Sequence, residues 1–300
     1  MKFKLDLYLK GVFMGIAEII PGVSGGTIAF ITGIYEELIN SIKSVDGNSI
    51  KLIFSLKFSL FWKQINGTFL LTLLLGMLTS VLALARVIVF LIDEHPFKIW
   101  GFFFGLIIAS AIVIFYQINS VNSKVFIAAL MGLVISSYIA LEAPSSTPNS
   151  NLFIFLSGAI AISAMILPGI SGSFILVFLS KYEFILNSLN NFDVAVISVF
   201  IGGCVVGLVT FSRVFSYLFK KYNDVVISVL VGFLLGSLLK IWPFYKVLEY
   251  NASNEPIYTN PVLPTSSQQG DLMYFILFSI IGFASMWLVE KKYIGLNKEI

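Results

Sequence analysis

A broken apolar segment that occurs twice constrains this chain more than any other feature. The stretch "IIPGVSGGTIAFITGIYEELINSI", residues 19–42, is apolar enough for a membrane helix, yet Pro21 and a group of glycines interrupt it. The stretch "LPGISGSFILVFLSKYEFILNSL", residues 167–189, repeats the pattern 147 positions later, so that Pro168 corresponds to Pro21. Proline and glycine are the residues that most readily end a helix. The duplication therefore predicts two helices that are broken at equivalent points.

Composition fixes the fold class. Hydrophobic residues make up 58% of the chain and charged residues 12%, and the mean hydropathy of +0.94 excludes a soluble globule of 300 residues. Several apolar runs reach the roughly 20 residues that a membrane-spanning helix needs, and no series of short alternating strands is present. The sequence predicts an all-α polytopic membrane protein. Its single cysteine, Cys204, allows no intramolecular disulfide and is expected to be a packing residue.

The chain divides into two halves, expected at residues 1–141 and 144–300. Each half begins with a re-entrant broken helix hairpin, at 11–42 and at 152–190. Three continuous spans are expected after each one, at 68–92, 97–118, 125–141, 194–219, 225–241 and 272–289. The first half alone adds an interfacial helix at 49–64, whose lysines lie among large apolar residues. No role is assigned to the loop at 242–270.

The distribution of lysines predicts how the halves cross the membrane. If the first broken segment enters from the cytoplasm and the second from outside, thirteen of the seventeen lysines lie on the cytoplasmic side. Three crossings per half is an odd number, so the second half runs through the membrane upside down relative to the first. This is an inverted-topology repeat, as in many secondary transporters. Both termini are expected to be cytoplasmic.

The position of the break explains its use. Ten residues of helix rise about 15 Å, so a break after that length lies near the middle of the bilayer. A helix that restarts there points free backbone N–H groups at the midplane, where glycine lets an anion approach closely and where Ser24 or Ser171 can cap the helix or donate to the anion. The alternative is a glycine-rich packing kink, which explains one copy better than two mirrored copies.

Two arginines lie inside apolar spans. Arg86 and Arg213 are the only arginines, and they end the matching strings "GMLTSVLALAR" and "GCVVGLVTFSR". An arginine at a helix centre costs about 2.5 to 3.5 kcal/mol on an insertion scale, so each is expected to face an interior partner rather than lipid. The planar guanidinium suits a phosphate because it can hold two oxygens at once. Structural pairing with a glutamate is the alternative, and it is compatible with ligand binding.

Three glutamates accompany the broken segments. Glu36 and Glu183 follow the paired tyrosines, whereas Glu18 precedes only the first break. Carboxylates at such depth are candidates for carrying protons or binding a coupling cation, although the ends of the segments can also be solvated. His95 is expected to be a solvated loop residue. No metal, cofactor or nucleic-acid partner is expected, and the sequence does not predict the oligomeric state.

The paired "PGVSGGT" and "PGISGS" motifs, each followed by Tyr-Glu, and the intramembrane arginine of each half resemble the bacterial polyprenyl-phosphate transporters of the PopT type over nearly the whole chain. The resemblance implies return of undecaprenyl phosphate from the outer to the cytoplasmic leaflet of the bacterial plasma membrane, where it again carries cell-wall precursors. It implies that the following motif residues contact the phosphate: Gly22, Ser24, Gly25, Gly26, Thr27, Gly169, Ser171, Gly172 and Ser173. Because Ser173 and Phe174 replace Gly26 and Thr27, the second loop is expected to offer fewer anion contacts.

Two other functions fit parts of the pattern. A soluble anion, such as a carboxylate or inorganic phosphate, can use the same midplane site. The G-x-S-G strings around Ser24 and Ser171 also resemble the serine motif of rhomboid proteases, but a nucleophilic serine needs a base within hydrogen-bond reach. His95 is the only histidine and is expected outside, which also disfavours a lipid phosphatase. The sequence therefore predicts a transporter that works by alternating access.

Overall fold

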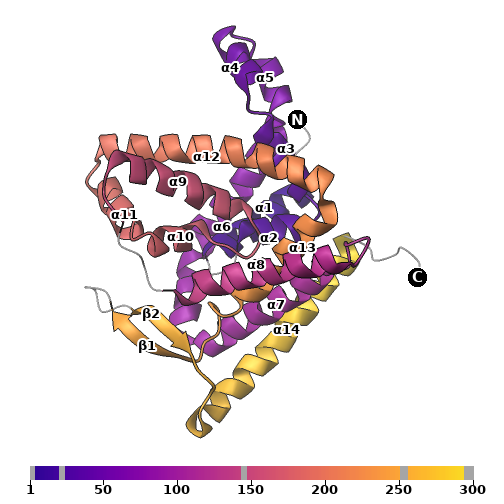
Figure 1. Ribbon diagram of the computed structural model, residues 1–300, viewed down its shortest axis with the longest axis vertical. Helices are drawn as coiled ribbons and strands as arrows, with labels where there is room; N and C mark the ends of the chain where they lie inside the picture. The colour runs from indigo at the N-terminus through magenta and orange to yellow at the C-terminus, as the bar shows by residue number, and fades with distance from the viewer. Residues whose placement is uncertain (1–3, 20–23, 143–146, 251–255, 294–300) are drawn as a thin grey trace.

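The two proline-glycine motifs separate short helices in the computed structural model, which describes residues 4–19, 24–142, 147–250 and 256–293 (Figure 1). α1 (Leu5–Ile19) leads to the first motif and α9 (Asn151–Ile166) to the second. The chain then resumes as seven-residue helices, α2 (Gly25–Ile31) and α10 (Gly172–Phe178). Pro21 and Gly22 lie outside the described residues.

Each broken segment has a second break that is not predicted from the sequence. α3 (Tyr35–Lys43) starts after a turn in which Gly33 has a φ of +71°, and α11 (Tyr182–Asn190) starts after Ser180, with a φ of +51°. α10 and α11 meet at an angle of 106°. The paired Tyr-Glu sequences therefore begin new helices on both sides of the molecule.

Six further helices complete the described part of the bundle. They are α6 (Gly67–Glu94), α7 (Pro96–Phe115), α8 (Ser123–Leu141), α12 (Val194–Lys221), α13 (Asn223–Ser237) and α14 (Gln269–Tyr293). Within the described ranges, five helices are long and apolar enough to cross a membrane, or six if the bent pair α10–α11 forms one span. The prediction of an all-α polytopic membrane protein is confirmed. α13 is shorter than expected because it ends at Ser237 rather than near residue 241.

Each of the main helix pairs has an equivalent that is related to it by the repeat. α1 packs along α6 as α9 packs along α12, and α7 packs along α14 as α13 packs along α8. Equivalent glycines permit this close approach, since a Cβ atom on Gly76 would lie 2.3 Å from the Tyr8 carbonyl oxygen, and one on Gly203 would lie 2.0 Å from that of Phe155. Gly76 and Gly203 are thus helix-packing positions.

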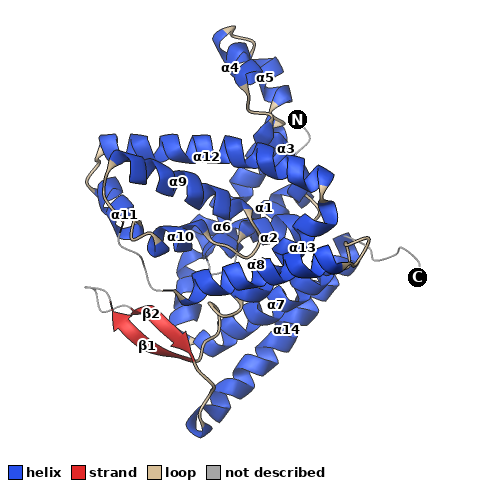
Figure 2. Ribbon diagram, in the orientation of Figure 1, coloured by secondary structure: helices blue, strands red, loops and turns tan. Residues whose placement is uncertain are grey.

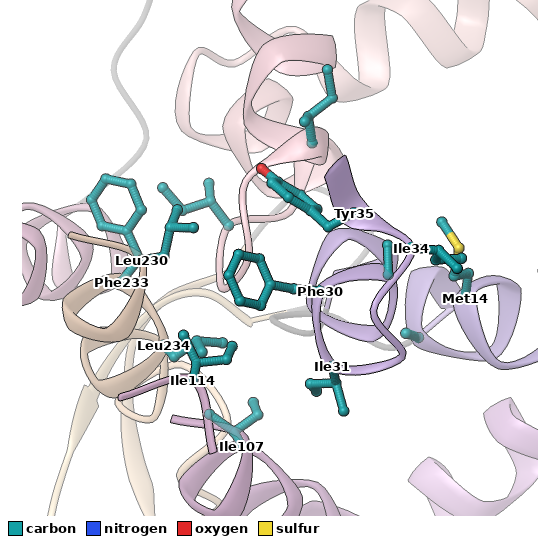
Figure 3. Close-up of a cluster of buried hydrophobic side chains, with 14 of the residues drawn as sticks. Met14, Phe30, Ile31, Ile34, Tyr35, Ile107, Ile114, Leu230, Phe233 and Leu234 are labelled. Carbon is teal, nitrogen blue, oxygen red and sulfur yellow. The ribbon is translucent and has the colours of Figure 1, made fainter. Parts of the chain in front are cut away.

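The core lies where the first broken segment meets the central helices. Figure 3 shows Phe30 and Ile31 of α2 directed toward side chains of α7 and α13, including Ile107 and Leu230. Ile31, Ile107 and Leu230 are almost completely buried. α2 is therefore enclosed by residues from both halves.

Two features lie outside the bundle core. β1 (Tyr245–Tyr250) and β2 (Pro256–Pro261) form an antiparallel hairpin in the region to which no role was assigned (Figure 2), and a short 3-10 helix, η1 (Ser266–Gln268), precedes α14. The expected interfacial helix is instead two helices, α4 (Gly47–Phe54) and α5 (Phe58–Gln64), which project from the bundle. They are separated at Leu56, whose φ is +56°.

Candidate functional site

The two motifs, 147 positions apart, touch at the centre of the molecule. The Ser24 hydroxyl donates a 3.0 Å hydrogen bond to the Met165 carbonyl, and the Gly169 backbone N–H donates a 3.2 Å bond to the Thr27 hydroxyl. Gly26 lies so close to the second half that a Cβ atom there would be 2.3 Å from the Ile166 carbonyl oxygen. Side chains of the first motif therefore bind the backbone of the second.

In the first loop, the backbone donors that start α2 are all occupied. The Gly25 N–H donates to the Glu18 carboxylate over 2.7 Å, the Gly26 N–H donates to the Ser24 hydroxyl over 3.1 Å, and the Thr27 N–H donates to the Ser24 carbonyl over 2.9 Å. Ser24 is thus the N-cap of α2, as the sequence allowed. An anion can reach the Gly25 N–H only by displacing Glu18.

The second loop leaves its donors free. Ser171 makes no side-chain cap, and its hydroxyl instead lies 2.8 Å from that of Ser173. No acceptor among the described residues takes the backbone N–H of Gly172, Ser173 or Phe174. Gly172 itself packs against the Ala161 carbonyl of α9. The expectation that the second loop offers fewer anion contacts stays a prediction, although the described backbone donors of the first loop already have acceptors.

Among the described residues, neither arginine makes a hydrogen bond to the two proline-glycine motifs. Arg86 on α6 and Arg213 on α12 are both exposed, so the expectation that each faces an interior partner is wrong here. Each helix has 28 residues, a length of about 42 Å that exceeds the hydrocarbon thickness, so a long side chain near its end can reach the interface. Arg213 donates to the Val45 carbonyl over 3.3 Å. Arg86 has no hydrogen-bond or ionic partner in the part of the chain that the structure describes.

Of the three glutamates, Glu18 contacts the first motif, through the hydrogen bond from the Gly25 N–H. Glu36 and Glu183 are exposed. Glu36 and Glu37 line an open groove with polar residues of α3 and with Asn66. Two carboxylates make this groove unsuitable for a phosphate.

Comparison with known proteins identifies the family. The family model described as undecaprenyl phosphate translocase-like matches residues 14–257. The chain belongs to this family. It is 39% identical over 287 residues to a Vibrio cholerae protein named polyprenyl-phosphate transporter, covering 95% of this chain and 91% of that protein. It is 32% identical over 260 residues to a Staphylococcus aureus protein of the same name, covering 81% and 87%. No solved structure gives a significant match.

An aromatic contact joins α3 to α12 in this family member. Tyr35 is only 3% exposed, and its ring centroid lies 5.6 Å from that of Phe215 and 6.4 Å from that of Phe219 on α12. Nearby, the Lys43 ammonium donates to the Ser216 hydroxyl over 3.1 Å. These residues come from different halves, and apart from the repeated tyrosine nothing in the sequence signals the contact.

The equivalent contact at the other end is missing. Tyr182 corresponds to Tyr35, yet it is 42% exposed. α3 packs against α12, whereas α11 shows no comparable packing against α6 among the described helices. α3 and α11 lie at opposite ends of α12 (Figure 1). The two halves therefore differ most where each broken segment reaches its own end of the bundle.

Proposed function

We propose that this protein moves undecaprenyl phosphate from the outer to the cytoplasmic leaflet of the bacterial plasma membrane for reuse in envelope synthesis. The names of its relatives supply the substrate class. The observation that carries the proposal is the buried meeting of the two motifs through Ser24 with Met165 and Thr27 with Gly169. A phosphate needs such a polar point within the bilayer, while its isoprenoid tail can stay in lipid.

The inverted repeat is part of this proposal. The recurring helix pairs and the placement of α3 and α11 at opposite ends of α12 support it. With the lysine bias, α3 lies on the cytoplasmic side, α11 lies on the outer side, and both termini are cytoplasmic. The structure then represents a state that is closed toward the cytoplasm.

The phosphate binds at the free donors of the second loop in this state. Ser171 and Ser173 supply hydroxyls, and the adjoining backbone supplies N–H groups. When the phosphate moves toward the first loop, it displaces Glu18 from the Gly25 N–H. Protonation of Glu18 removes the competing negative charge, so Glu18 is a stronger candidate for proton coupling than Glu36 or Glu183.

The proposed alternating access rests on the difference between the two ends of the bundle, since Tyr35 is buried at one end and Tyr182 is exposed at the other. In the opposite state, α11 packs against α6 and α3 leaves α12, so Tyr182 becomes buried as Tyr35 is released. The Tyr35 hydroxyl has no hydrogen-bond partner among the described residues although it is buried. Such a group costs about 1 to 3 kcal/mol, which favours reopening of the closed end.

The arginines act at these ends in turn. Arg213 bonds the Val45 carbonyl at the closed end. Its positive charge also helps to lower the pKa of Asp46, although the hydrogen bond from the Ser49 backbone N–H is the larger cause. The repeat aligns Val45 and Asp46 with Phe192 and Asp193. Arg86 is then free for the headgroup while its end is open, and it engages Phe192 and Asp193 when that end closes.

The contacts of the serines favour a transporter over a serine hydrolase. The Ser24 hydroxyl donates to a backbone carbonyl, and the Ser171 hydroxyl pairs with another serine. His95 lies between α6 and α7, with its ring beside Phe90. Across the described part of the chain, no basic side chain makes a hydrogen bond to either serine.

The test is leaflet exchange by purified protein in vesicles. Undecaprenyl phosphate, undecaprenol and inorganic phosphate should be compared. We expect exchange of the lipid phosphate alone. Movement of inorganic phosphate without lipid exchange would support the soluble-anion function, and release of phosphate from the lipid would indicate an enzyme.

A further inference from the structure

Lys240 is a half-buried cation that has no anionic partner among the described residues. It follows the end of α13 and is half-buried, and its ammonium nitrogen lies 4.3 Å from the centroid of the Phe174 ring on α10. The described residues provide no oxygen that bonds this ammonium. Partial removal of a lysine from water is unfavourable unless an opposite charge or several hydrogen-bond acceptors compensate for it.

A second buried lysine shows how this chain satisfies such a group. Lys181 is 1% exposed, and its ammonium donates to the Thr147 carbonyl over 2.7 Å and to the Asn149 side-chain oxygen over 2.6 Å. Lys240 has only an aromatic face, which attracts a cation but accepts no ordinary hydrogen bond. Its three N–H donors therefore remain available to a ligand.

The surroundings of Lys240 place it beside the second motif. Phe174 directly follows Ser173, whose hydroxyl pairs with that of Ser171. The backbone of Phe233 and Leu234, one to two turns before Lys240, lies against Gly169, which has a φ of +83° and no room for a Cβ atom. α13 and the second motif thus hold the cation and the two hydroxyls in one region of the bundle.

The halves differ at this point. Thr27 corresponds to Phe174 and bonds the Gly169 N–H of the other half, whereas Phe174 contacts the Lys240 ammonium. When "GFFFG" at residues 101–105 is aligned with "GFLLG" at residues 232–236, the position equivalent to Lys240 in the first half is Ala109. The cation is therefore a feature of the second half only, on the end that is open in this structure.

We propose that Lys240 binds the phosphate group of the substrate as it enters from the open end. This inference rests on the proposed function, because that function supplies the anion. The Phe174 ring holds the ammonium in place until the phosphate arrives, and the Ser171 and Ser173 hydroxyls complete the contacts. A lysine serves here as a strong point charge, so the positive charge matters more than the shape of the donor.

The experiment is equilibrium binding of undecaprenyl phosphate to purified protein in lipid nanodiscs, with undecaprenol and inorganic phosphate as comparison ligands. Lys240→Gln should bind undecaprenyl phosphate about tenfold more weakly, since a lost charge-assisted bond commonly has that effect. Lys240→Arg should retain most of the affinity. Lys246→Gln, which changes an exposed lysine of β1, is the matched control and should bind normally.

A second measurement uses the unmodified protein and does not depend on a variant folding. Undecaprenyl phosphate should protect Lys240 from acylation by an amine-reactive reagent, as read by mass spectrometry, and should not protect Lys246. Equal binding by Lys240→Gln, or no protection of Lys240, overturns the inference and leaves the proposed function standing. Lys240-dependent binding of inorganic phosphate alone overturns the proposed function instead, and binding of neither phosphate overturns both.

Discussion

The Glu18 carboxylate accepts a 2.7 Å hydrogen bond from the Gly25 backbone N–H, so the chain holds its own anion at the first proline-glycine loop. A phosphate that reaches this loop competes with that carboxylate. Only the first half has such a group, because Met165 stands at the equivalent position. The two loops therefore differ in charge as well as in free donors.

Glu18→Gln should abolish the response of exchange to a pH gradient. The amide can still accept the Gly25 N–H, so the loop should stay folded, but it cannot gain or lose a proton. Exchange in vesicles with and without an imposed gradient measures the effect. Glu36→Gln and Glu183→Gln change exposed carboxylates and should keep the response. A Glu18→Gln protein that still follows the gradient would exclude this carboxylate as the coupling group.

Tyr35→Phe should slow exchange by favouring the closed end. The ring contacts with Phe215 and Phe219 stay, while the buried hydroxyl without a partner is removed. A change of roughly 1 kcal/mol corresponds to about a fivefold shift in population. Tyr182→Phe is the comparison, since Tyr182 is exposed in this state and its loss of a hydroxyl should favour the opposite state instead. Cysteine accessibility at position 40 should fall in Tyr35→Phe but not in Tyr182→Phe, and the same fall in both would contradict the assignment of the closed end.

Arg213→Gln should loosen the closed end of the bundle, where Arg213 bonds the Val45 carbonyl. Arg86→Gln should impair binding of the phosphate headgroup at the open end. Cysteine accessibility at position 40, in a Cys204→Ala background, should rise in Arg213→Gln and stay low in Arg86→Gln. Lysine at either position should rescue only partly, because it loses the planar fork of the guanidinium. Normal exchange by both glutamine variants would refute any role of the arginines.

The contribution of Asp46 to the stability of the closed end should not change with pH in the neutral range. Its pKa is lowered, mainly by the Ser49 backbone N–H, so its stabilising contacts are fully present above the unfolded pKa of about 3.9. These contacts are lost only as the pH falls through the pKa of Asp46 in the folded protein, which is lower than in the unfolded chain. Accessibility at position 40 should therefore be the same at pH 5 and pH 8, and Asp46→Asn should raise it at both.

Ser24→Ala should destabilise the fold more than Ser173→Ala does. Ser24 caps α2 and also bonds the Met165 carbonyl of the other half, whereas the Ser173 hydroxyl pairs only with its neighbour Ser171. Loss of a serine N-cap typically lowers the free energy of unfolding by about 1 kcal/mol. Denaturation of both variants in detergent measures the difference, and equal midpoints would contradict the structural role of Ser24.

The sequence predicted the features that depend on local chemistry. The apolar runs predicted the long helices, and the repeated proline and glycine predicted where α2 and α10 restart. The second breaks before Tyr35 and Tyr182 went unnoticed because no proline marks them, and Leu56 divides α4 from α5 without any breaker residue.

Contacts between distant segments could not be predicted in the same way. Insertion energies suggested buried arginines, but α6 and α12 are long enough for Arg86 and Arg213 to lie near interfaces. The sequence places Lys240 near the end of the expected span at 225–241, whereas α13 ends at Ser237 and the Lys240 side chain turns toward Phe174. The contact of Tyr35 with Phe215 joins helices from different halves, and no local pattern of residues predicts it.

The most direct test of the account is undecaprenyl phosphate exchange by a protein that is locked at its closed end. Cysteines at positions 35 and 215, in a Cys204→Ala background, can be joined by a short cleavable thiol cross-linker within reconstituted vesicles. We predict that cross-linking stops exchange, that cleavage restores it, and that the locked protein still binds undecaprenyl phosphate. Exchange that continues at its full rate in the locked protein would contradict transport by alternating access.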